Sequence, residues 1–140
     1  RRDISAFNTP GFAHDGPKVM LANGYSASGG DALPYYFRLN GLGPIIGTRT
    51  WGGLIGLSGG PSLLDGGAVQ IPSFRIYDRQ GRWVVENEGV APDIEVIDLP
   101  EARIKGGDPS LEKGVQVLLE ELKKKSVVPP AAPRPPNLAN

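Results

Sequence analysis

The chain has 140 residues, of which 39% are hydrophobic and 21% are charged; these are ordinary values for one globular domain and exclude a collagen, a mucin or a fully disordered chain. Fifteen basic and fifteen acidic residues give a formal net charge of zero. No overall field therefore attracts nucleic acid or an anionic membrane, and we expect neither as a partner. The sequence has no run of about 18 apolar residues, so it predicts no membrane span.

Cysteine is absent and His14 is the only histidine. These counts exclude disulfides, thiolate metal sites and any site that needs two imidazoles, and we expect neither a metal nor a cofactor. The lack of cysteine leaves the compartment open, with the cytoplasm slightly favoured over the periplasm. The chain begins with Arg1 rather than methionine, so we expect a processed product or a piece of a longer protein.

The first predicted elements are a strand and a helix. Residues 18–22 form a short apolar run of the length of a buried strand. A cluster of small residues follows, and a helix is expected to start near Gly29 and to end at residues 40–41. Pro34 lies inside this helix and is expected to be tolerated only near the first turn.

The middle of the chain is predicted to be mostly strand. Between residues 44 and 96, short apolar or β-branched runs alternate with glycine turns, and residues 78–81 have the composition of a hairpin turn. A second helix is predicted over 109–125, where Asp108 can cap the start. Its apolar residues repeat at helical spacing: Leu111, Val115, Leu118, Leu119 and Leu122. The proline-rich tail over 126–140 is expected to be extended or disordered.

Ser28 lies between the predicted strand and the first predicted helix, with Ala27, Gly29 and Gly30 beside it. Free backbone amides at a helix N-terminus favour negative charge. Small neighbours let a carbonyl approach, and the amide after the serine can donate to an oxyanion, as acyl transfer requires. The pentapeptide YSASG over 25–29 is not the G-x-S-x-G elbow, and such turns also bind phosphate or only reverse the chain. The pattern alone leaves these interpretations open.

Three segments together resemble the ordered motifs of the tricorn protease catalytic core. They read LANGYSASGGD over 21–31, GTRTWGG over 47–53 and VENEGVAPD over 85–93. The resemblance extends over residues 16–98 and is looser through the second helix. It implies a serine peptidase of the tail-specific, C-terminal processing superfamily with a crotonase-like or ClpP-like α/β fold, which hydrolyses peptide bonds through an acyl-enzyme.

The resemblance also implies roles for individual residues. Ser28 matches the nucleophile, and Gly29 matches the residue whose N–H forms one half of the oxyanion hole. Glu86 matches the acid of a Ser-His-Ser-Glu tetrad, where it orients the histidine together with an auxiliary serine; without the resemblance, Glu86 is interpreted as a turn carboxylate that caps backbone amides. Related processing peptidases use a Ser-Lys dyad, but Gly53 occupies the lysine position and cannot accept a proton. Trp51 is interpreted as a packing aromatic, and contact with the substrate is the alternative.

Several parts of the family's catalytic machinery have no counterpart in the chain. The family's histidine, its auxiliary serine and the second oxyanion donor all lie upstream of the nucleophile, and His14 is interpreted as a surface or turn residue. The expected organisation is a lead-in segment over 1–17, the C-terminal half of a peptidase catalytic domain over 18–107, a C-terminal helix over 108–125 and a proline-rich tail over 126–140.

This organisation predicts the partners of the chain. We expect the missing N-terminal half of the same protein, a peptide substrate, and homo-oligomer formation through apolar surfaces that an isolated half leaves exposed. The 140 residues alone are expected to hydrolyse peptides poorly or not at all. The alternatives are a non-catalytic module that binds peptides or acyl groups on the same fold, and an assembly element that acts through the second helix and the tail.

Overall fold

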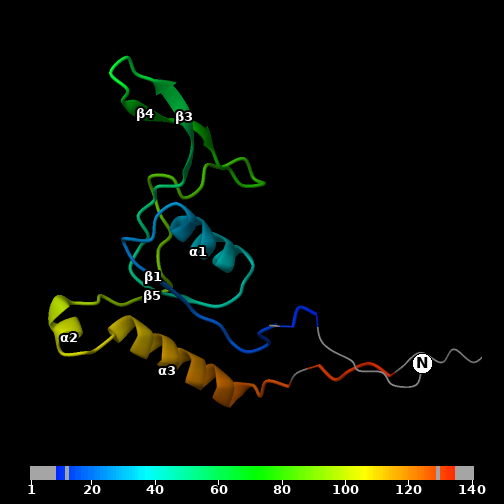
Figure 1. The fold of residues 1–140 in the computed structure, drawn as a ribbon. Helices are drawn as coiled ribbons and strands as arrows, with labels where there is room; N and C mark the ends of the chain where they lie inside the picture. The colour runs from blue at the N-terminus through cyan, green and yellow to red at the C-terminus, as the bar shows by residue number, and fades with distance from the viewer. Residues whose placement is uncertain (1–8, 12, 129, 135–140) are drawn as a thin grey trace, which may run out of the picture.

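The computed structural model describes residues 9–11, 13–128 and 130–134, and Figure 1 shows its elements. The predictions for the ends of the lead-in and the tail (1–8, 12, 129 and 135–140) lie outside the described residues. In chain order the elements are β1 (Met20–Ala22), α1 (Gly29–Leu39), β2 (Ile45–Gly47), β3 (Ile55–Ser62), β4 (Ala68–Arg75), β5 (Ile94–Glu95), α2 (Pro100–Ile104) and α3 (Pro109–Lys124). Among the described residues, no helix has the length and apolarity that crossing a membrane requires.

A small parallel sheet with the strand order β1-β2-β5 lies at the centre of the fold. The register pairs Met20 with Ile45 and Ile46 with Ile94, and α1 forms the crossover between β1 and β2. Ile45 and Ile46 are both fully buried, as a central parallel strand is when both faces are covered. Helix α1 contacts β1, helix α3 contacts β1 and β2, and Figure 1 shows the two helices on opposite sides of the sheet. The predicted α/β class is confirmed at this level.

Helix α1 confirms the prediction of a helix after Ser28, and its end at Asn40 and Gly41 is also confirmed. Gly41 has a φ of 59°, which glycine adopts without steric cost after a helix. Pro34 differs from the prediction because it lies in the second turn. It removes one backbone hydrogen bond there, and burial of its ring offsets that loss.

The middle of the chain contains less strand than predicted. Residues 83–85 are not a strand, and only Trp83 takes part in an isolated bridge, with Tyr77. Val85 has a φ of 69°, which cannot continue an extended strand. The turn at 78–81 is confirmed, because an N–H···O bond of 3.0 Å joins its last residue to its first.

The antiparallel hairpin of β3 and β4 carries most of the remaining strand residues. Figure 1 shows it projecting away from α1 and the sheet, and every residue of β4 is exposed. A two-stranded hairpin is marginally stable by itself in water. Most of its large apolar side chains are exposed, among them Leu57, Leu64, Val69, Ile71 and Phe74.

Helix α3 begins as predicted, because the Asp108 carboxylate accepts a hydrogen bond from the N–H of Leu111 at 3.1 Å. Its buried positions are Ser110 and Gly114. A side chain at Gly114 would lie 3.3 Å from Leu21 in β1, so a small residue lets the helix approach the sheet. Most of the predicted apolar repeat stays exposed: Leu111, Val115, Leu119 and Leu122.

Candidate active site

Ser28 comes directly before α1 and has a backbone conformation that is rare for a residue with a side chain. Its φ is 53° and its ψ is −107°, and positive φ is uncommon in non-glycine residues because Cβ crowds the backbone. Residues strained in this way cluster at functional sites. Ser28 is also exposed, so the structure presents this serine to solvent on a strained strand-to-helix turn.

Gly29 is the first residue of α1, and the space beside it is open. The first N–H groups of a helix have no partner within the helix. A Cβ built on Gly29 would meet no protein atom within 4 Å among the described residues, apart from its neighbours in the chain. The side of Gly29 on which a Cβ would stand is therefore not covered by the described residues.

The turn over 50–53 lies beside the turn that carries Ser28, since the N–H of Trp51 donates to the carbonyl of Ser26 at 2.9 Å. Trp51 does not pack into the core: it is 69% exposed, and its ring lies over Gly53. A Cβ at Gly53 would be 2.6 Å from the indole. The indole thus occupies the space beside Gly53, and a side chain at this position could enter only if the indole moved.

Glu86 lies in a turn whose flanking residues, Val85 and Asn87, both have positive φ, at 69° and 64°. Glu86 is half-buried, and its Oε2 atom is buried with no hydrogen-bond partner among the described residues. A buried carboxylate oxygen without a partner is costly and therefore needs an explanation. This oxygen caps no described backbone amide, so the simple interpretation of Glu86 as a capping turn residue lacks support.

The turn over 50–53 holds the Glu86 turn in place. The N–H of Asn87 donates to the carbonyl of Gly52 at 2.8 Å. The buried Thr50 hydroxyl accepts from the N–H of Val90 at 2.8 Å. The structure therefore brings the Ser28 and Glu86 turns to two sides of one shared turn.

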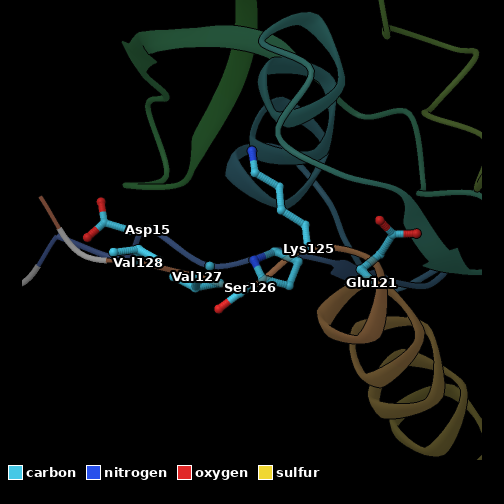
Figure 2. A pocket seen from close by; sticks show the side chains of 8 residues that line it. Asp15, Glu121, Lys125, Ser126, Val127 and Val128 are labelled. Carbon is cyan, nitrogen blue, oxygen red and sulfur yellow. The ribbon is translucent and has the colours of Figure 1, made fainter.

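His14 lies elsewhere. It is exposed, its Nε2 is 3.3 Å from the carbonyl of Pro17, and it lines a hollow of about 450 Å³ with Leu118 and Leu122 of α3. Figure 2 shows the adjoining hollow, where Asp15 and residues 126–128 lie near the end of α3. Neither hollow is lined by Ser28 or Glu86, so the structure does not bring His14 to the candidate site.

Sequence reasoning missed Asp31. Its side chain is completely buried, and its carboxylate accepts the N–H of Ser28 at 2.8 Å and two further backbone N–H groups from the 50–53 turn. A serine followed three residues later by an acidic residue is the signature of a capping box. That spacing could have indicated the first of these bonds, but not the two long-range ones.

Comparison with known proteins places the chain in a family. The sequence profile of Peptidase family S41 matches residues 2–96. Tricorn protease homolog 1 of Streptomyces coelicolor is 37% identical over 133 residues, 94% of this chain, and Tricorn protease of Thermoplasma acidophilum is 38% identical over 108 residues, 77% of this chain. A crystal structure of the tricorn protease matches 88% of the chain with a TM-score of 0.78 and 35% identity. The chain belongs to peptidase family S41.

The chain is short beside these proteins. It spans 12% of the Streptomyces relative and 10% of the Thermoplasma relative, and 12% of the chain in the tricorn crystal structure. These shares are consistent with a part of a larger protein.

Proposed function

We propose that this chain is part of a tricorn-type serine peptidase with a crotonase-like or ClpP-like α/β fold, and that Ser28 is its nucleophile. The observation that carries the proposal is the exposed, strained turn of Ser28 at the start of α1 in a chain of family S41. The parallel strands joined by α1 support the fold assignment. The substrates are peptides or unfolded proteins.

In the proposed reaction, Ser28 Oγ attacks the carbonyl carbon of the scissile peptide bond while its proton passes to a histidine. The negative charge that develops on the carbonyl oxygen is stabilised by the N–H of Gly29 and by a second donor. The histidine then gives its proton to the leaving amine, which leaves an ester on Ser28. Water, activated by the same histidine, hydrolyses this ester and restores the serine.

The histidine, the auxiliary serine and the second oxyanion donor come from the upstream half of the protein. Glu86 orients the histidine in this proposal, and its unpartnered buried Oε2 supports that role, because such an atom is poised to accept a hydrogen bond from a group outside the described residues. We propose no metal or other cofactor.

The proposed organisation keeps 1–17 as a lead-in, 18–107 as the C-terminal half of the catalytic domain, 108–125 as a C-terminal helix and 126–140 as a tail. The exposed apolar residues of α3 and of the β3–β4 hairpin support burial of these surfaces against the upstream half and in a homo-oligomer. Light scattering of the 140-residue chain tests the second part, since a monodisperse monomer would contradict self-association.

Peptide hydrolysis by a longer form that carries the upstream half tests the function. Ser28→Ala should reduce kcat by about 10³-fold or more, whereas Ser26→Ala, two residues away, should retain most of the activity. The 140-residue chain alone should be inactive or nearly so. Full activity of Ser28→Ala would refute the proposal. Loss of activity in Ser26→Ala but not in Ser28→Ala would assign the nucleophile to Ser26 instead.

A further inference from the structure

Asp31 makes the densest set of hydrogen bonds at the candidate site. It is 0% exposed, and one oxygen accepts the N–H of Ser28 at 2.8 Å and that of Gly53 at 3.0 Å. The other oxygen accepts the N–H of Gly52 at 2.8 Å. Hydrogen bonds to an ionised acceptor are stronger than neutral ones, so this carboxylate holds three backbone groups together.

These bonds fix the peptide units on both sides of Ser28. The N–H of Ser28 is held by the side chain of Asp31, and the carbonyl of Ser28 accepts from the N–H groups of Asp31 and Ala32, both at 2.9 Å. In a planar trans peptide, the N–H points opposite to the preceding carbonyl. Because the Ser28 carbonyl points into the helix, the N–H of Gly29 is directed away from it, toward the N-terminal end of the helix.

The same carboxylate reaches the Glu86 turn through one intervening residue. Gly52 donates its N–H to Asp31 and accepts the N–H of Asn87 at 2.8 Å through its carbonyl. Asn87 follows Glu86 directly in the chain. A continuous series of hydrogen bonds therefore connects the two turns that carry Ser28 and Glu86.

We propose that Asp31 is a positioning residue. It sets the orientation of Ser28 and of the Gly29 N–H, and it keeps the Glu86 turn at a fixed position relative to them. The proposal rests on the proposed function. Asparagine is nearly the same size as aspartate, but its NH₂ group is a donor. In Asp31→Asn this group must face at least one of the three N–H donors, so the arrangement loosens although the side-chain volume is kept.

The control is Asp93→Asn. Asp93 also accepts a backbone N–H, that of Ile45 at 2.7 Å, and pairs with Arg38 at 2.9 Å. It therefore contributes to the fold through the same kinds of bond, but it contacts neither Ser28 nor the 50–53 turn. Both variants are made in the longer form, with folding checked by circular dichroism and thermal unfolding.

The readouts are the rate of fluorophosphonate labelling at Ser28, and kcat and KM for a peptide. Asp31→Asn should lower the labelling rate and kcat by about 10²-fold while KM changes by less than about threefold. Asp93→Asn should lower Tm but change the labelling rate by less than about threefold. A labelling rate that falls equally in both variants, or in neither, would overturn the positioning role.

The experiment also distinguishes failure of the proposed function from failure of the Asp31 proposal. If the unsubstituted protein is not labelled at Ser28, the proposed function fails and the Asp31 proposal fails with it; if it is labelled and Asp31→Asn leaves the rate unchanged, only the Asp31 proposal fails. Should Asp31→Asn not fold, Asp31→Glu keeps the charge but moves the oxygens by one methylene. Its labelling rate should fall at least about tenfold, and an unchanged rate would overturn the proposal.

Discussion

The turns around Ser28 and the β3–β4 hairpin are both rich in glycine, but they use it differently. In the site, a side chain at Gly52 would lie 2.6 Å from the backbone nitrogen of Gly89, whereas one at Gly66, in the turn of the hairpin, would meet nothing within 4 Å among the described residues. The site is held by its own backbone contacts. The hairpin is exposed to solvent, so substitutions in the two regions should have unequal effects.

The largest difference is expected for one matched pair of glycines. Gly52 and Gly66 have almost the same φ, 83° and 82°, so alanine is strained equally at both. Gly66→Ala should cost about 1 kcal/mol, and Gly52→Ala about 3 kcal/mol or more, because backbone atoms block the new methyl group. Urea unfolding of both variants measures the difference, and equal losses would show that the site is no tighter than the hairpin.

Introducing the lysine of the dyad enzymes tests the packing of Trp51. Gly53→Lys should destabilise the chain by about 1–3 kcal/mol, because its Cβ meets the indole, and it should not produce a Ser-Lys peptidase. The double variant Trp51→Ala/Gly53→Lys should recover part of the stability. The comparison uses thermal unfolding of the single and double variants; a single variant as stable as the parent would contradict the steric account.

Removing one hydroxyl group from each region compares the two regions with smaller expected losses of stability. Thr50→Val leaves the buried N–H of Val90 without an acceptor and should cost about 1–3 kcal/mol. In the hairpin, Ser73 shares an exposed Oγ···Oγ contact of 2.6 Å with Ser58. Ser73→Ala should change stability by no more than about 0.5 kcal/mol. Denaturant midpoints at constant m-value give the loss of stability in each variant. A larger loss in Ser73→Ala than in Thr50→Val would be inconsistent with a tightly bonded site.

The smallest expected effect concerns pH and the docking of α3. Burial opposes ionisation of Asp98, but hydrogen bonds from Ser110 and Arg103 outweigh it and hold the pKa of Asp98 below its ordinary value. A lowered pKa in the folded state stabilises the fold above the unfolded pKa of about 3.9, and that contribution is lost as the pH falls through the folded pKa. Tm should therefore decline below about pH 4, and it should decline less steeply in Asp98→Asn. Thermal unfolding as a function of pH measures both. If Tm falls equally steeply with pH in the variant, Asp98 does not contribute to the decline.

Helices α1 and α3 could be predicted because their start signals are local, whereas the five-residue α2 was not predicted. Asp108 caps α3 from the position directly before it, and the small residues around Ser28 precede α1. The buried face of α3 was not evident, since Gly114 and Ser110 approach the sheet while most of the leucines that mark the helix stay exposed.

Where sequence reasoning failed, contacts between distant segments decided the structure. Val85 is β-branched and favours a strand, but it is buried with a φ of 69°, in a turn that the distant residue Gly52 holds by accepting the N–H of Asn87 at 2.8 Å. The importance of Asp31 arises from two bonds to residues 21 and 22 positions further along the chain. Such pairings require the fold, and no local pattern specifies them.

The most direct test of the central claim is to locate the reactive serine. A longer form that carries the upstream half is treated with a fluorophosphonate, digested, and analysed by mass spectrometry, with Ser28→Ala in parallel. We predict a single adduct on Ser28 that is absent from the variant. An adduct on another serine, or a protein that is active on peptides yet unlabelled at Ser28, would contradict the assignment of the nucleophile.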